Sequence, residues 1–394
     1  MQLVAYGAQD IYLTGNPQIT FFKVVYRRHT NFSMESIDQT LTGSPGAGAK
    51  VSATISRNGD LIHKMYVAFD PSLLNLTTVI GPNIGNTLLK EIELEIGGQR
   101  VDRHYGHWLT VWSDLTEVNP TGLQTVVGTN CLEPLVGTAT LAQLNSYNHR
   151  GLAGTQTSAA GPKMAHVPLQ FWFCRNPGLA LPLIALQYHE VKVNITFCAA
   201  NALCTGNTLT ATSTKLWVDY IYLDTDERRR FAQQSHEYLI EQLQFQQTTG
   251  ARVELNFNHP VKELIWTGQP ASVATATAGP GTPTALAGAA AVDTYLIKLN
   301  GHERFAARHC NYFTRTQVYQ HHTGFGGVTV KDSIGVYSFA LKPEEHQPSG
   351  TCNFSRIDNA VLVQGGTANN LNVYAVNYNV LRIMSGMGGL AYSN

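Results

Sequence analysis

The chain has 394 residues, a mass of 43.1 kDa and a hydrophobic content of 43%, which is enough for two domains with cores of their own. Only 14% of its residues are Asp, Glu, Lys or Arg, against roughly 25% in ordinary soluble domains, and the 27 basic and 27 acidic side chains cancel. Because no basic excess exists, general nucleic-acid binding is disfavoured, whereas a surface so poor in charge suits large contacts with other subunits.

The six cysteines include no Cys-x-x-Cys pair, and the first residues lack the basic and apolar regions of a secretory signal. We therefore expect reduced thiols and a cytosolic place of assembly. No run of apolar residues approaches the roughly 18 that a membrane-spanning helix needs.

Residues 1–30 are expected to form an N-terminal arm that precedes the first domain. Within them Phe22, Val24 and Tyr26 recur at every second position, which is typical of a half-buried strand. The alternative is a segment that reaches onto a neighbouring molecule.

Residues 31–223 contain many short apolar stretches separated by turns, such as the tight-turn dipeptides Asn58-Gly59 and Gly97-Gly98. The predicted strands are residues 51–55, 61–69, 92–96, 99–101, 167–173, 191–197 and 217–223. Short strands with few helical stretches between them are typical of an all-β sandwich or barrel.

Residues 224–242 begin with the most charged stretch of the chain, in which six of the first seven residues carry a charge. Asp224, followed three residues later by Glu227, resembles the capping box at the start of a helix. Residues 231–242 contain no Gly or Pro and many good helix formers. The segment is predicted to be a linker helix between two halves, with Arg228–Arg230 in salt bridges rather than at a phosphate.

Residues 243–394 repeat the order of the first half. The matched segments are residues 253–257 and 261–266 with 51–55 and 61–69, 295–302 with 93–99, and 376–382 with 217–223. A Phe-x3-Pro-x4-Pro spacing also occurs twice, at Phe173, Pro177 and Pro182 and at Phe339, Pro343 and Pro348. Four matches in one order are not expected by chance, so the chain is predicted to be a tandem duplication of one β-domain.

Histidines are the first candidates for a metal site. The closest groupings are His104 with His107 and the pair His321-His322. A metal site on a strand usually combines His-x-His on one face with a carboxylate, and the sequence contains no His-x-His. These histidines are expected to bond to backbone groups, and no metal-binding residue is predicted.

Other candidates for chemistry are equally weak. Cys198 and Cys204 lack a second pair to complete a zinc site and are expected to be small buried residues. A glycan hydrolase or amidase needs paired carboxylates, and the only obvious pair, Glu344-Glu345, consists of sequence neighbours whose side chains diverge. We predict no catalytic residue, no cofactor-binding residue and no cofactor.

A carbohydrate-binding module is a third possibility, with Trp172, Trp217 or Trp266 as a platform for a sugar. These tryptophans lie in predicted strands, where such residues more often belong to the core.

Four segments, residues 7–32, 219–231, 338–350 and 374–391, resemble the major capsid proteins of nucleocytoplasmic large DNA viruses. The resemblance spans both ends of the chain and the charged joint. It implies an all-β fold of two tandem eight-stranded jelly-roll β-sandwiches joined by a short helix or linker. The expected divisions are the arm 1–30, the first jelly roll 31–223, the linker helix 224–242 and the second jelly roll 243–394.

The resemblance also implies a function. It predicts a structural protein without catalytic activity, whose homotrimer forms a pseudo-hexagonal capsomer that tiles the icosahedral shell of a large double-stranded DNA virus. The implied partners are copies of the chain in the trimer and in neighbouring capsomers, penton and minor capsid proteins and, as an open alternative, the inner viral membrane. Specific nucleic-acid binding is not expected. The implied location is the capsid of the virion, after assembly in the host cytoplasm.

Overall fold

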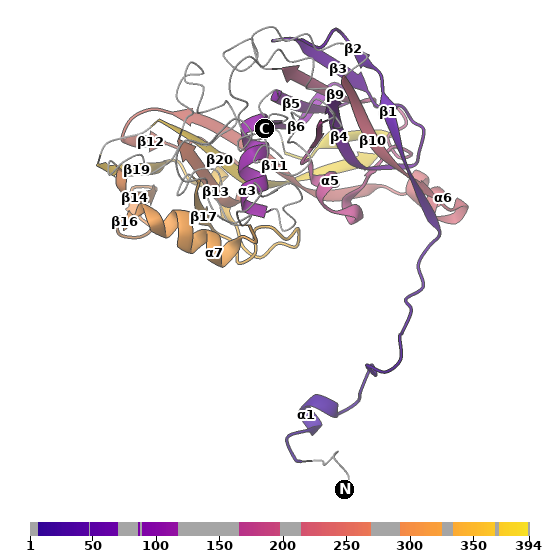
Figure 1. Cartoon of the computed structure of the whole chain (residues 1–394), viewed down its shortest axis with the longest axis horizontal. Coiled ribbons are helices and arrows are strands. Elements are labelled where there is room, and N and C mark those ends of the chain that lie inside the picture. Colours follow the sequence, from indigo (N-terminus) through magenta and orange to yellow (C-terminus); the bar gives the residue numbers. More distant parts are fainter. Residues whose placement is uncertain are drawn as a thin grey trace, which may run out of the picture.

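The computed structural model describes residues 7–46, 48–69, 86, 89–116, 165–197, 214–268, 292–324, 334–366 and 370–392. Its strands form four antiparallel sheets, which make two sandwiches that lie side by side (Figure 1). A thin N-terminal segment with one short helix, α1 (Ile11–Thr14), extends away from both.

The first sandwich consists of two sheets. One has the spatial order β1 (Phe32–Gln39), β10 (Thr214–Leu223), β4 (Leu61–Phe69) and β7 (Ala165–Pro168), and β8 (Leu181–Pro182) also pairs with β4. The other has the order β2 (Leu41–Thr42), β3 (Lys50–Thr54), β9 (Val191–Phe197), β5 (Leu89–Ile96) and β6 (Gln99–Tyr105). Its helical segments are α3 (Gly106–Thr116), α5 (Trp172–Arg175) and the 3-10 turn η3 (Pro177–Leu179).

The second sandwich follows a nine-residue helix, α6 (Thr225–Gln233). One sheet has the order β11 (His236–Thr248), β20 (Leu371–Met384), β13 (Pro260–Gly268) and β17 (Ile334–Ser338), extended by β18 (Cys352–Asn353) and β21 (Met387–Leu390). The other has β12 (Arg252–Glu254), β19 (Ala360–Gly366), β14 (Val292–Leu299) and β15 (His302–Glu303), with β16 (Arg308–His309) also on β14. Three helical segments accompany it: η4 (Tyr312–Thr316), α7 (Gln317–His321) and η5 (Phe354–Arg356).

The two sandwiches repeat one topology. The order β1-β10-β4-β7 returns as β11-β20-β13-β17, and β3-β9-β5-β6 returns as β12-β19-β14-β15. Every pair of segments matched in the sequence falls on corresponding strands, and the two Phe-x3-Pro-x4-Pro stretches each follow the last strand of the corresponding sheet, β7 or β17. The predicted tandem duplication and the predicted double jelly roll are therefore confirmed.

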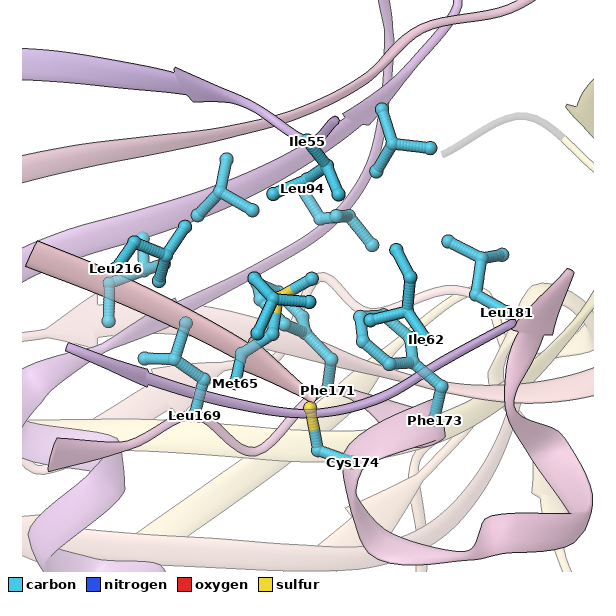
Figure 2. Packing of buried hydrophobic residues seen from close by; sticks show 14 of the residues in the cluster. Ile55, Ile62, Met65, Leu94, Leu169, Phe171, Phe173, Cys174, Leu181 and Leu216 are labelled. Carbon is cyan, nitrogen blue, oxygen red and sulfur yellow. The ribbon is translucent and has the colours of Figure 1, made fainter. Parts of the chain in front are cut away.

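Alternation of side chains explains the first core. Met65 and Val67 of β4 turn inward with Leu94 of β5 from the opposite sheet, and all three are almost completely buried. Figure 2 shows Met65 and Ile62 facing Leu94 across the space that Phe171 helps to fill. Each such buried side chain contributes roughly 1.5–3 kcal/mol relative to an exposed one.

Three further residues of this core come from the second half of the chain. Ile240 of β11, with Leu381 and Ile383 of β20, belongs to the first sandwich's buried cluster although these strands pair in the second sandwich. The two sandwiches therefore share part of one hydrophobic core.

Two predicted elements of the sandwiches differ from the structure. The helix expected through residue 242 ends at Gln233, because residues 236–248 pair along their full length with β20 and the ladder overrides helical propensity. The strand expected over residues 167–173 ends at Pro168, and residues 172–175 form the single helical turn α5.

Candidate functional site at the joint of the two sandwiches

The candidate histidines of the first sandwich lie in its interior. His104 packs on Phe171, with ring centroids 4.3 Å apart, and His107 Nδ1 lies 2.7 Å from the Tyr374 hydroxyl. Burial, with a smaller effect from Arg175, lowers the pKa of His104 to about 3, and burial lowers that of His107 to about 4. Both rings are neutral at physiological pH. Among the residues that the structure describes, no group of three or more His, Cys, Asp or Glu side chains is arranged to hold a metal ion.

The remaining chemical candidates do not form a site either. Cys198 and Cys204 lie outside the described residues. Glu344 accepts a hydrogen bond from His322, whereas Glu345 pairs with Lys342 at the surface, so the two carboxylates act separately.

The tryptophans offer no exposed platform for a sugar. Trp172 and Trp266 are almost fully buried, and Trp217 is half-buried on β10 beside Lys215. In the described part of the chain, no helix is long and apolar enough to cross a membrane.

The charged stretch is an anchored helix. The Asp224 carboxylate caps α6 by accepting from the Thr225 N–H at 2.8 Å. Arg228 donates to the Asp60 carboxylate from both Nε (2.9 Å) and Nη2 (3.1 Å). The same carboxylate accepts a hydrogen bond from the Leu223 N–H at 2.9 Å. One arginine of the three thus fixes the joint to the turn before β4.

Arg228→Ala is expected to lower the free energy of unfolding by about 1–2 kcal/mol, because it leaves the nearly buried Asp60 carboxylate without its cation. The exposed Arg229 and Arg230 serve as matched controls, and their replacement by Ala should leave stability unchanged. Urea denaturation of the three variants measures the difference. Equal losses of unfolding free energy in all three variants would mean that α6 is a solvated connector and that Arg228 does not anchor it.

The two Phe-x3-Pro-x4-Pro loops meet at one buried carboxylate, Glu241 of β11. From the first loop, Arg175 Nη1 donates to Glu241 Oε2 at 3.0 Å. From the second sandwich, Lys262 Nζ donates to Glu241 Oε1 and to the Pro343 carbonyl, both at 2.7 Å. His346, in the second loop, places Nδ1 3.5 Å from the same carboxylate.

The electrostatics at Glu241 favour the ionised form. Burial alone would raise its pKa, but His346, Lys262 and Arg175 lower the pKa to about 2. Lys262 is 1% exposed and lies over the Tyr378 ring, so its ammonium depends on this carboxylate. The site is an ion network that crosses from one sandwich to the other.

An apolar layer lies beside the ion network. Helix α3 of the first sandwich packs Trp108 and Trp112 against the second sandwich, where Trp108 approaches Tyr374 at 5.0 Å between ring centroids. The Arg175 guanidinium covers the Trp112 ring at 4.1 Å. Cation–π contact and hydrophobic burial thus hold the joint together with the ion pairs.

A second buried ion cluster contacts the second Phe-x3-Pro-x4-Pro loop through Glu344. His322 Nε2 lies 3.0 Å from Glu263 Oε2, and His322 Nδ1 lies 3.0 Å from Glu344 Oε1. Burial by itself would lower the pKa of His322, but Glu263 and Glu344 raise it to about 9. The ring is therefore an imidazolium that donates to both carboxylates.

His322 should make stability depend on alkaline pH. Because its pKa is raised on folding, its contribution is fully present below about 6.5 and is lost as the pH rises through about 9. We expect the free energy of unfolding, followed by thermal denaturation, to fall by on the order of a few kcal/mol between pH 7 and 10. In His322→Gln this fall with pH should be largely absent. If His322→Gln shows the same dependence of unfolding free energy on pH as the wild type, other groups are responsible for it.

The N-terminal segment is the most exposed part of the described chain. Residues 22–27 form no strand, contrary to the prediction, and regular pairing begins only at Phe32. Phe21, Phe22 and Tyr26 are 91%, 98% and 86% exposed, and the segment runs away from the body of the molecule (Figure 1). Its alternating side chains lack a partner surface within the described residues of this chain.

A polar cleft of about 190 Å³ opens along the seam between β6 and β11. Gln242 of β11 donates to the Val101 carbonyl of β6, and the Leu243 N–H donates to Asp102 Oδ1 at 3.2 Å. Loop residues 256–259 form the remaining wall. Side chains, rather than a backbone ladder, therefore connect the two strands.

Comparison with known proteins covers the whole chain. Residues 20–224 match a protein-family model described as "Major capsid protein N-terminus", and residues 227–389 match one described as "Large eukaryotic DNA virus major capsid protein". The chain is 51% identical to the major capsid protein of Pyramimonas orientalis virus, over 100% of this chain and 99% of that one. It is 45% identical to the major capsid protein of Paramecium bursaria Chlorella virus 1, with the same coverage.

The fold is similar to a solved capsid structure. A chain in a quasi-atomic model of the PBCV-1 virus capsid has a TM-score of 0.75 and 39% sequence identity, and the match covers 95% of this chain and 100% of that one. The boundary between the two family models, at residues 224–227, coincides with the start of α6.

Proposed function

Because this chain belongs to the major capsid proteins of large eukaryotic DNA viruses, we propose that three copies of it form a pseudo-hexagonal capsomer. The chain is a structural component of the virion capsid, and its relatives are named as structural capsid proteins, in accord with a role without catalysis. The observation that carries the proposal is the repeated strand order within one chain. Three copies around a threefold axis present six similar sandwiches, which matches a sixfold environment in the shell.

The domain limits and partners of the capsomer follow from this proposal. We take residues 1–30 as the arm, 31–223 as the first jelly roll, helix α6 as the linker and residues 236–394, which begin with β11, as the second jelly roll. The low charge of the chain suits large lateral contacts between capsomers. Penton and minor capsid proteins complete the shell, the inner viral membrane lies beneath it as a further partner, and assembly takes place in the host cytoplasm.

Sedimentation velocity of the purified full chain tests the trimer. A species of about three times 43.1 kDa that persists on dilution is the expected result, with hexagonal particles in electron micrographs. A chain that remains monomeric at micromolar concentration overturns the proposed capsomer.

A further inference from the structure

The seam cleft joins two sheet edges that do not pair with each other. Strand β6 is the last strand of its sheet and β11 is the first strand of its own. Asp102 of β6 bridges them, because its Oδ1 accepts both the Arg103 N–H at 2.8 Å and the Leu243 N–H at 3.2 Å. Free edges of this kind bind extended segments through backbone hydrogen bonds.

Asp102 gives the cleft an acidic group without a salt-bridge partner among the described residues. The residue is 7% exposed and lines the cleft, and within the described part of the chain no group donates to its second oxygen, Oδ2. The two arginines of the cleft are engaged elsewhere, Arg100 with Glu93 at 3.4 Å and Arg103 with Glu91 at 2.9 Å. Burial accordingly raises the pKa of Asp102 to about 7. A cationic side chain entering the cleft would add to the weaker influence of Arg175 and stabilise the ionised carboxylate.

The arm of the chain has the complementary chemistry. Residues 18–31 carry Lys23, Arg27 and Arg28 and contain no Asp or Glu. They form a turn and a bend at residues 21–23 and no regular structure after that, are rich in β-branched and aromatic residues, and are exposed along their length. Because the arm leads away from its own body, its exposed side chains are placed to contact another molecule (Figure 1).

We propose that the cleft between β6 and β11 binds the basic arm segment, residues 18–31, of a second copy of this chain. The arm lies along the free edges of the two strands, and one of its cations pairs with Asp102. This inference rests on the proposed function, because it requires copies that sit beside one another in a capsomer or between capsomers. The arm then links one molecule to the joint of the next.

Disulfide trapping in the full chain tests the contact. Val24→Cys in the arm is combined with Asn258→Cys on the exposed wall of the cleft, and mild oxidation is followed by non-reducing electrophoresis. We expect intermolecularly linked dimers and trimers, at least about tenfold above the control pair Val24→Cys with Tyr319→Cys, which is exposed and does not line the cleft. A synthetic peptide of residues 18–31 should compete with the trapping.

Asp102→Asn separates recognition from structure. Asn retains the oxygen that accepts from Arg103 and Leu243, so the melting temperature should not fall, while trapping should drop by about tenfold because the charge is lost. If the protein sediments as an assembly but the Val24→Cys and Asn258→Cys pair forms no more disulfide than the control pair, the inference is overturned and the proposed capsomer is not. A disulfide within one chain also overturns it, because the occupant is then the molecule's own arm. A protein that sediments only as a monomer overturns the proposed capsomer together with the inference.

Discussion

Replacing Glu241 by Ala lowers the free energy of unfolding by about 3–5 kcal/mol, the cost expected when one partner of a buried ion pair is removed. Among the described residues, the change leaves the Lys262 ammonium, 1% exposed, with the Pro343 carbonyl and the Tyr378 ring as its remaining contacts. It also releases Arg175, which carries the ion network across the seam. Urea denaturation monitored by tryptophan fluorescence measures the loss.

The matched control for Glu241 lies on the same strand. Glu237 pairs with Arg382 at 2.9 Å but is 60% exposed, so Glu237→Ala should have little effect. Adding Lys262→Met to Glu241→Ala should restore much of the stability, because an apolar side chain does not need a counter-charge in the interior. Comparable losses for Glu237→Ala and Glu241→Ala would contradict the assigned role.

Trp108→Ala is expected to destabilise the protein by about 3–5 kcal/mol, because truncation of a buried tryptophan leaves a large cavity. Trp108 is 1% exposed and lies between Trp112 of its own helix and Tyr374 of the second sandwich. The cavity therefore opens between the sandwiches, and their unfolding should become less cooperative. Differential scanning calorimetry should show the single transition broadening or dividing in two.

Trp217 provides the comparison for Trp108. It is half-buried on β10, outside the contact between sandwiches, so Trp217→Ala should shift the transition less and keep its shape. A transition that stays single and equally sharp in Trp108→Ala would mean that α3 does not couple the two sandwiches.

The repeated fold was predictable because its signals are local. Strands β4 and β9 have the bounds expected from their sequence, since a turn or a change of composition flanks each alternating run. The helix expected through residue 242 was wrong because helical propensity competes with a partner strand more than a hundred residues away, residues 371–384, which local sequence does not show.

The joint was only partly predictable. The charged stretch pointed to α6, and the repeated Phe-x3-Pro-x4-Pro spacing pointed to the two loops, without singling out Arg175 or showing that the loops approach each other. Glu241 carried no motif, because its importance arises from burial between two cations supplied by distant segments. A charged residue flanked by alternating apolar positions in the repeat was the available signal, and it is too common to identify a site.

The shared core has a consequence for how the chain is made. All strands of the first sandwich's own sheets lie before residue 224, so they emerge from the ribosome and pair while the second half is still being synthesised. Leu381 and Ile383, which complete that core, are translated more than 150 residues after the last strand of that sandwich's own sheets, β10 (Thr214–Leu223). A nascent or prematurely ended chain therefore exposes an apolar gap in its first sandwich. The first sandwich is complete only when strand β20 has been made, so we expect chains that end before it to be less stable.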